Sequence, residues 1–226
     1  MPRPIQATID TAALRHNLSH ARQAAPDAQA WAVVKANAYG HGIERIFEGL
    51  RAADGIALLD LSEAERVRQL GWRGPILLLE GAFETRDLEM CSRLNLWHVV
   101  HSEAQIDMLA VHKTHQPHRV FLKMNTGMNR LGFAPQAFRA AWTRLNALPQ
   151  VDEISLMSHF SDADGDKGIG AAMALFHQFT QDLSGERSLC NSAASLRHAN
   201  DVLVRADWIR PGIALYGSSP DYPHHS

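Results

Sequence analysis

The sequence of 226 residues is poor in cysteine, in net charge and in long apolar runs. Its two cysteines, Cys91 and Cys190, cannot build a disulfide framework, and without a CxxC pair they cannot form a zinc site alone. With 22 Lys and Arg against 24 Asp and Glu, the net charge of −2 argues against a nucleic-acid binder, which usually carries a basic stripe. No apolar run approaches the roughly 18 residues of a membrane span, and the first ten residues, MPRPIQATID, lack the apolar core of a signal peptide. We therefore expect a cytoplasmic protein with reduced thiols and no bound metal, which binds neither nucleic acid nor a membrane.

Eight short apolar runs recur along the chain, and the segments between them have the three-to-four-residue apolar spacing of helices. One of these segments places Leu14, Leu18, Ala21 and Ala25 on one face. The predicted strands cover residues 31–36, 55–59, 75–79, 96–100, 119–124, 153–157, 188–190 and 208–210. Eight strands in 226 residues suit eight β-α units, which predict a closed parallel (β/α)8 barrel of the TIM type, an α/β fold. An open, doubly wound sheet is the structural alternative.

The first predicted strand runs into AVVKANAYGHG, where period-two alternation puts Trp31, Val33 and Lys35 on one face. Functional groups of a barrel lie at the C-terminal ends of its strands, so Lys35 should point into the barrel mouth. Desolvation lowers the pKa of a lysine and makes its amine a better nucleophile. Lys35 is therefore a candidate for a Schiff base with an aldehyde. The alternative is a lysine that only extends its ammonium group to the surface.

Two further strand ends carry nitrogen-bearing side chains. The fifth strand leads into MNTGMNRLGF, so that Lys123 and Arg130 flank one strand end and its loop. Two cations without a nearby acid indicate an anionic ligand group, or a modification that makes one of them negative; a solvated basic loop is the alternative. The sixth strand leads into MSHF, which places His159 at the barrel mouth, either as a satisfied polar residue or flat against a planar ring.

The last two strand ends point to an anion site. In CNSAAS, Asn191 and Ser192 come directly before a predicted helix, where backbone N–H groups and a serine hydroxyl can bind an anion. In WIRPGIALYG, Arg210 ends the eighth strand, and Pro211 and Gly212 turn the chain. Barrels of this kind commonly bind phosphate beside strands seven and eight.

Together, the segments AVVKANAYGHG, MNTGMNRLG, MSHF, NSA and WIRPGIALYG resemble, in order and spacing, the N-terminal barrel of bacterial alanine racemases, over about residues 6–217. That family uses pyridoxal 5′-phosphate (PLP) to interconvert L-alanine and D-alanine, and thereby supplies D-alanine for the peptidoglycan of the cell wall. The resemblance implies an isomerase with PLP as cofactor, alanine as substrate and a homodimeric full-length protein.

The resemblance also implies roles for the residues around one end of the cofactor. Lys35 resembles the lysine that is linked to PLP and serves as one of two catalytic bases. Tyr39 and Ser192 would contact the phosphate, with Asn191 beside them, and further N–H donors would come from the backbone of Gly212 and Ile213.

The other end of the cofactor would be held by cationic and imidazole groups. Arg130 would donate to the phenolic oxygen of PLP and contact the substrate, and His159 would lie beside the ring. Lys123 matches a lysine that is carbamylated in some members, which would turn its charge negative and orient Arg130. Arg210 would donate to the pyridine nitrogen. Because guanidinium only donates and stays charged, that nitrogen would remain unprotonated.

Family members continue into a β-rich C-terminal domain, whose tyrosine is delivered across the dimer as the second base. Neither Tyr216 nor Tyr222 matches its motif. We therefore expect a PLP-binding barrel over residues 1–217, a tail or severed connection over residues 218–226, and incomplete catalysis by this chain alone. A racemase of another amino acid and a stand-alone PLP carrier of the cofactor-homeostasis type are the alternatives.

Overall fold

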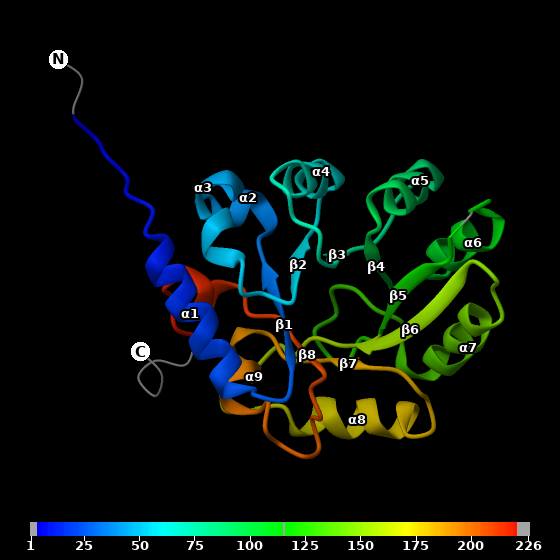
Figure 1. Ribbon diagram of the computed structural model, residues 1–226. Helices are drawn as coiled ribbons and strands as arrows, with labels where there is room; N and C mark the ends of the chain where they lie inside the picture. The colour runs from blue at the N-terminus through cyan, green and yellow to red at the C-terminus, as the bar shows by residue number, and fades with distance from the viewer. Residues whose placement is uncertain (1–3, 115, 221–226) are drawn as a thin grey trace.

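The computed structural model describes residues 4–114 and 116–220, and over these residues eight parallel strands curve into one barrel (Figure 1). Neighbouring strands follow the order β7-β6-β5-β4-β3-β2-β1-β8. The strands are β1 Gln29–Val33, β2 Gly55–Leu58, β3 Ile76–Leu78, β4 Trp97–Val100, β5 His118–Lys123, β6 Val151–Met157, β7 Arg187–Ser188 and β8 Trp208–Ile209. Each predicted strand corresponds to one of them.

The two ends of this strand order meet and close the ring. The backbone N–H of Asp207 donates to the carbonyl oxygen of Arg187 at 3.0 Å, and the N–H of Arg210 donates to that of Cys190 at 2.9 Å. The Ser188 hydroxyl adds a bond to the Trp208 carbonyl at 3.1 Å. An open doubly wound sheet would leave two free edges, so that alternative is wrong and the (β/α)8 barrel is confirmed.

Helices form the outer layer of the barrel (Figure 1). The apolar face predicted from Leu14 to Ala25 is buried against the rest of the chain. Its helix begins after Asp10, whose carboxylate accepts the N–H groups of Ala12 and Ala13. The helices are α1 Thr11–Ala24, α2 Lys35–Tyr39, α3 Ile43–Ile46, α4 Leu61–Gln69, α5 Thr85–Leu94, α6 Glu103–Val111, α7 Pro135–Asn146, α8 Gly170–Thr180 and α9 Ser192–Arg197, with 3-10 turns η1 Phe47–Leu50 and η2 Ile213–Tyr216. Within residues 4–114 and 116–220, no helix has the length and apolarity to cross a membrane.

Aromatic side chains fill the inside of the barrel. Trp31 stacks on Trp208 with ring centroids 4.2 Å apart, and Phe121 meets Trp31 edge to face at 6.1 Å. Trp31, Phe121 and Trp208 all come before the last residue of their strands, so this aromatic layer lies deeper in the barrel than the strand ends. The C-terminal mouth is left for polar side chains.

The first strand is shorter than its sequence pattern predicts. β1 ends at Val33 rather than Ala36, and Lys35 opens α2 instead of ending the strand. Residues 36–39 all have φ between 52° and 58°, so α2 is a left-handed turn. The eighth strand likewise ends at Ile209, one residue before Arg210. Of the predicted tail, residues 221–226, with Tyr222, lie outside the described residues.

Candidate functional site

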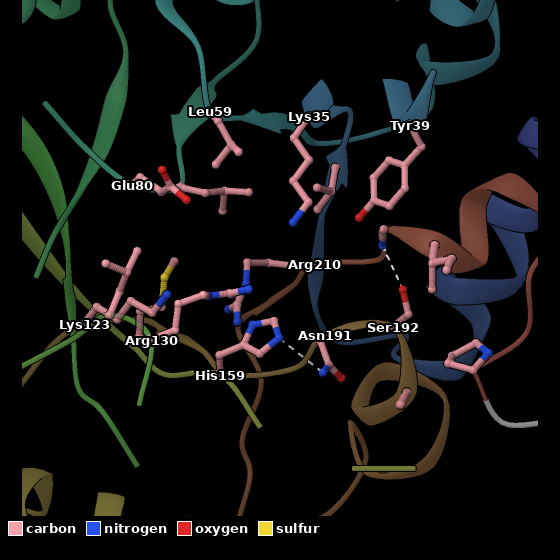
Figure 2. A pocket seen from close by; sticks show the side chains of 18 of the residues that line it. Lys35, Tyr39, Leu59, Glu80, Lys123, Arg130, His159, Asn191, Ser192 and Arg210 are labelled. Atoms are coloured by element: carbon pink, nitrogen blue, oxygen red, sulfur yellow. Dashed lines mark hydrogen bonds between the residues drawn. The ribbon is translucent and has the colours of Figure 1, made fainter. Parts of the chain in front are cut away.

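A cavity of about 260 Å³ opens where the strands end (Figure 2). Its wall includes Val33 at the end of β1, Lys123 at the end of β5 and Met157 at the end of β6. All ten residues that the sequence singled out line this one cavity: Lys35, Tyr39, Lys123, Arg130, His159, Asn191, Ser192, Arg210, Gly212 and Ile213. The fold therefore brings together residues that are up to 178 positions apart, from Lys35 to Ile213.

Lys35 extends its amine into the cavity from the left-handed turn after β1 (Figure 2). Its Nζ atom lies 6.0 Å from the centre of the Tyr39 ring. Burial lowers the pKa of Lys35, the positive charge of Arg130 lowers it further, and the carboxylate of Glu80 opposes both. A lowered pKa leaves more of the amine neutral, which is the form that attacks carbonyl carbons.

Two hydroxyl groups form one end of the cavity. The Ser192 hydroxyl accepts the backbone N–H of Gly212 at 2.8 Å and that of Ala214 at 3.4 Å, so its own hydrogen is left to donate to a ligand. Burial raises the pKa of Tyr39, which keeps its hydroxyl protonated and a donor. This end of the cavity is suited to an anion. The Gly212 N–H, which the sequence analysis expects beside the phosphate, donates to the Ser192 hydroxyl at this end of the cavity.

Tyr216 holds Tyr39 in place rather than facing the cavity. Its ring stacks on the Tyr39 ring at 4.6 Å, and its hydroxyl donates to the Val33 carbonyl at 3.0 Å. Burial raises the pKa of Tyr216 well above that of an ordinary tyrosine. Its proton is therefore not available to a group bound in the cavity.

Arg210 is almost completely buried and rigidly held. Nη1 donates to the carbonyl and the hydroxyl of Ser188, and Nη2 donates to the carbonyls of Ser158 at 2.7 Å and Leu189 at 3.4 Å. Within the described part of the chain, its Nε hydrogen has no acceptor, and the residue lines the cavity. Burial lowers the pKa of Arg210 to about 10, so the guanidinium still carries its charge at neutral pH.

Lys123 and Arg130 lie on the opposite side from Tyr39 and Ser192 (Figure 2). Lys123 is only 6% exposed. Its burial, with the charges of Arg210 and Arg130, lowers its pKa to about 8, against the opposing effect of Glu80. Arg130 is exposed and makes no hydrogen bond to the residues that the structure describes. Both cations are therefore open to an anionic partner.

His159 is held neutral between these groups. Asn191 Nδ2 donates to the Phe160 carbonyl at 3.1 Å and lies 3.4 Å from His159 Nε2. Asn191 also caps α9, since its Oδ1 accepts the N–H of Ala194 at 3.0 Å. Burial and the charge of Arg210 lower the pKa of His159 to about 3. The imidazole is therefore uncharged at neutral pH.

Two acidic residues of the cavity wall, Glu80 and Asp164, were missed by the sequence reasoning. Glu80 lies two residues after the end of β3, so the rule that strand ends carry functional groups could have found it. Its backbone carbonyl accepts Gln105 Nε2 at 2.9 Å, which fixes the strand end. Asp164 lies in the loop after β6, where no pattern marks it. Nowhere in residues 4–114 and 116–220 do three His, Cys, Asp or Glu side chains gather in a way that could hold a metal ion.

Comparison with known proteins gives a consistent result. The family of alanine racemase N-terminal domains matches residues 9–220. An alanine racemase of Methylibium petroleiphilum is 76% identical over 225 residues, which is 100% of this chain and 61% of that protein. The biosynthetic alanine racemase of Pseudomonas aeruginosa superimposes with a TM-score of 0.89 at 42% identity, over 95% of this chain and 60% of that one. At 25% identity, the alanine racemase of Bartonella henselae with covalently bound pyridoxal phosphate gives a TM-score of 0.82, over 96% of this chain and 62% of that one. The chain thus spans about three fifths of the proteins that it matches.

Proposed function

The chain belongs to the family of alanine racemase N-terminal domains, and from this premise we propose that it forms the PLP-binding barrel of an enzyme that interconverts L-alanine and D-alanine. One observation carries the proposal. Lys35, whose pKa is lowered, lines the same cavity as the two hydroxyl groups of its anion-binding end and the buried Arg210. This arrangement supports a racemase, an isomerase that supplies D-alanine for peptidoglycan in the cell wall.

The residues present fit the cofactor at three points. The free O–H of Ser192 and the Tyr39 hydroxyl would hold the phosphate. Lys35, between the two ends of the cavity, would bond to the aldehyde carbon. Arg210 Nε would donate to the ring nitrogen, and the neutral His159 would lie against the ring. The Bartonella henselae enzyme holds its pyridoxal phosphate covalently, which supports a covalent bond between this chain and the cofactor.

The chemistry that bound PLP supplies is electron withdrawal from the Cα atom of the amino acid, which makes the Cα hydrogen acidic. Lys35 would carry that proton at Cα on one side of the substrate. Its lowered pKa suits the task, because a base works best when its pKa is near the operating pH. Tyr39, with its raised pKa, would keep its proton and serve as a phosphate donor rather than a second base.

Arg210 would make bound PLP a weaker acceptor of electrons from Cα. Four acceptors around Nη1 and Nη2 leave the guanidinium no freedom to turn, so Nε keeps one direction of donation. A guanidinium cannot accept a proton, so a ring nitrogen that faces it stays unprotonated. Cα then remains the atom at which protons leave and return, as racemisation requires.

Lys123 is proposed as a site of carbamylation. Its neutral amine would add to carbon dioxide, forming an N–C bond and releasing one proton, and the product would carry a negative charge. With a pKa of about 8, Lys123 keeps a useful neutral fraction near neutral pH. The negative group would stand among Arg210, Arg130 and Lys35, and would orient Arg130 toward the phenolic oxygen of PLP and the substrate.

The second proton carrier and the dimer belong to the proposal for the whole enzyme. Inversion at Cα requires a group on each face of the substrate. We assign only Lys35 to this task among the described residues, and the full-length enzyme would act as a homodimer that supplies the second group. A cytoplasmic location fits the two thiols, Cys91 and Cys190, which are buried and free.

A chimera tests the proposed function. Residues 1–226 would be joined to the remaining two fifths of the Methylibium petroleiphilum enzyme, and conversion of L-alanine would be followed by circular dichroism. We expect conversion by the chimera and none by its Lys35→Ala variant. Conversion of another amino acid in preference to alanine, or PLP binding without any racemisation, would contradict the proposal and favour one of the alternatives.

A further inference from the structure

The turn that links Lys35 to Tyr39 has an unfavourable backbone. Ala36, Asn37, Ala38 and Tyr39 have φ of 53°, 52°, 58° and 52°, four consecutive left-handed residues without a glycine among them. In this conformation the Cβ atom of an L-residue crowds the following carbonyl oxygen. Such a segment persists only where its surroundings hold it.

A buried carboxylate supplies one such contact. Glu63 Oε1 accepts the backbone N–H of Asn37 at 2.5 Å. Glu63 is 8% exposed, and its other oxygen, Oε2, is buried without a hydrogen-bond partner in the described part of the chain. Burial of a carboxylate costs free energy that hydrogen bonds must offset, and within the described residues the bond from the Asn37 N–H is the hydrogen bond that the Glu63 side chain makes.

A second contact holds the side chain of the same residue. Asn37 Oδ1 accepts Arg66 Nη2 at 2.9 Å and the backbone N–H of Ile43 at 3.2 Å. Arg66 is itself held by both carboxylate oxygens of Glu44, each at 2.7 Å. Backbone and side chain of Asn37 are therefore fixed from two directions.

Both holding residues come from α4, which lies outside the barrel beside α2 and α3 (Figure 1). Glu63 and Arg66 are three residues apart, so they share one face of that helix. Neither residue lines the cavity, whereas Lys35 and Tyr39, on either side of the held segment, both do. The side chains of Glu63 and Arg66 thus act on the cavity through the turn.

We propose that Glu63 is a positioning residue: through the N–H of Asn37 it holds the left-handed turn, and so keeps the Lys35 amine and the Tyr39 hydroxyl on the cavity wall. Arg66 and Glu44 form the outer half of the same clamp. Only the consequence for PLP rests on the proposed function. The placement of Lys35 follows from the chain's own contacts.

The pKa of Lys35 depends on where its amine lies, so a titration shows the position of the amine without any cofactor present. Its pKa is lowered by burial and by Arg130 from the loop after β5, and raised by Glu80 from the end of β3. If the turn relaxes, Lys35 gains solvent and its pKa rises. Loss of the negative charge of Glu63 would by itself lower the pKa of a lysine, so a rise cannot be a charge effect.

The chain has four lysines, which makes the measurement direct. Acetylation by trace acetic anhydride at a series of pH values, read by mass spectrometry, gives a titration midpoint for each. The exposed Lys113 and Lys167 serve as internal references. In E63A we expect the Lys35 midpoint to rise by about half a pH unit or more toward the references.

Three variants separate positioning from general destabilisation. V67A removes buried methyl groups from the same helix without touching the turn, and should leave the Lys35 midpoint unchanged. E63Q keeps an acceptor oxygen and should restore the parent midpoint. R66K keeps the positive charge but loses the forked contacts of the guanidinium group to Glu44 and Asn37, so it should shift the midpoint in the same direction as E63A by a smaller amount. It decides the question if E63A does not fold.

The proposal is overturned if the Lys35 midpoint is unmoved in E63A, or in R66K where E63A does not fold. It is overturned equally if V67A or E63Q moves the midpoint as far as E63A does. A separate titration with PLP should show about tenfold weaker binding to E63A than to the parent. If the parent itself binds no PLP, the proposed function fails, while the lysine midpoints still decide the role of Glu63.

Discussion

Gly212 and Tyr39 are packed so closely that no side chain fits between them. A Cβ atom on Gly212 would lie 2.4 Å from the Tyr39 hydroxyl oxygen. The N–H of the same glycine donates to the Ser192 hydroxyl at 2.8 Å. One residue without a side chain therefore sets the position of both hydroxyls at the anion end of the cavity.

We expect Gly212→Ala to weaken PLP binding by about tenfold, equivalent to about 1.4 kcal/mol, because the added methyl group must displace the Tyr39 hydroxyl. The measurement is an absorbance titration with PLP. Gly170→Ala, at the start of α8, is the matched control, since a Cβ there meets nothing within 4 Å. Parent-like affinity in Gly212→Ala would show that this hydroxyl does not hold the phosphate.

Lys123 should take up carbon dioxide. With ¹³C-labelled bicarbonate, we expect a carbamate signal in the ¹³C NMR spectrum of the parent and its loss in Lys123→Arg, which keeps the positive charge but cannot form the same adduct. The physical reason is the pKa of about 8, which leaves neutral amine available near neutral pH. A carbamate signal of equal size in Lys123→Arg would show that the carbamate forms at another residue, and the absence of the signal in the parent would show that Lys123 is not carbamylated.

His98 and His118, two of three clustered and buried histidines outside the site, should make the protein sensitive to acid. His98 and His118 have ring centroids 5.1 Å apart, and His112 lies 5.2 Å from His118. All three have an Nε2 atom without a partner among the described residues. Burial and the neighbouring imidazoles lower the pKa of His98 to about 3 and that of His118 to about 4.

The unfolded chain therefore binds more protons than the folded one between about pH 4 and pH 6.5, and stability falls as pH falls through this window. At pH 5 each of His98 and His118 should cost about 2 kcal/mol relative to pH 7. Urea unfolding of the parent and of His98→Leu at pH 5, 6, 7 and 8 checks this. The variant should lose less stability on acidification, and parallel curves for the two proteins would refute the assignment.

The barrel was predictable because buried parallel strands read as short apolar runs, and their spacing gives the β-α repeat. The site followed from the position of side chains relative to strand ends, as for Lys123 and Arg210. The same rule would have found Glu80, which follows β3 in the same way. The fold and most of the residues of the cavity wall could thus be predicted from local sequence patterns.

The left-handed turn was not predictable from local patterns. The period-two apolar pattern predicts that the first strand continues to Ala36. Nothing in the sequence KANAY indicates that several residues other than glycine would have positive φ angles. The contact that holds it comes from Glu63, 26 residues later. Asn191 is similar, since its contact with His159 spans 32 residues. Such pairings exist only once the fold has formed.

Residues 1–226 alone should interconvert the enantiomers of alanine slowly. Lys35 can move the Cα proton on one face only, and loss of a general acid or base typically costs 10²–10⁴-fold. We would follow deuterium uptake at Cα and enantiomer conversion together, in D₂O with added PLP, beside the full-length Methylibium petroleiphilum enzyme. The expected result is deuterium exchange that is faster than the slow conversion of the enantiomers. Conversion at about 10 s⁻¹ or faster would mean that these residues hold a second base.

The central claim is that Lys35 is the residue that bonds to the cofactor, and chemical trapping tests it most directly. PLP would be added to the chain, the carbon–nitrogen bond reduced with borohydride, and the peptides mapped by mass spectrometry. The four lysines lie at positions 35, 113, 123 and 167, so each adduct is assigned without ambiguity. The account predicts the pyridoxyl group on Lys35, with Lys35→Ala unlabelled. Recovery of the adduct mainly on Lys123 or Lys167 would contradict it.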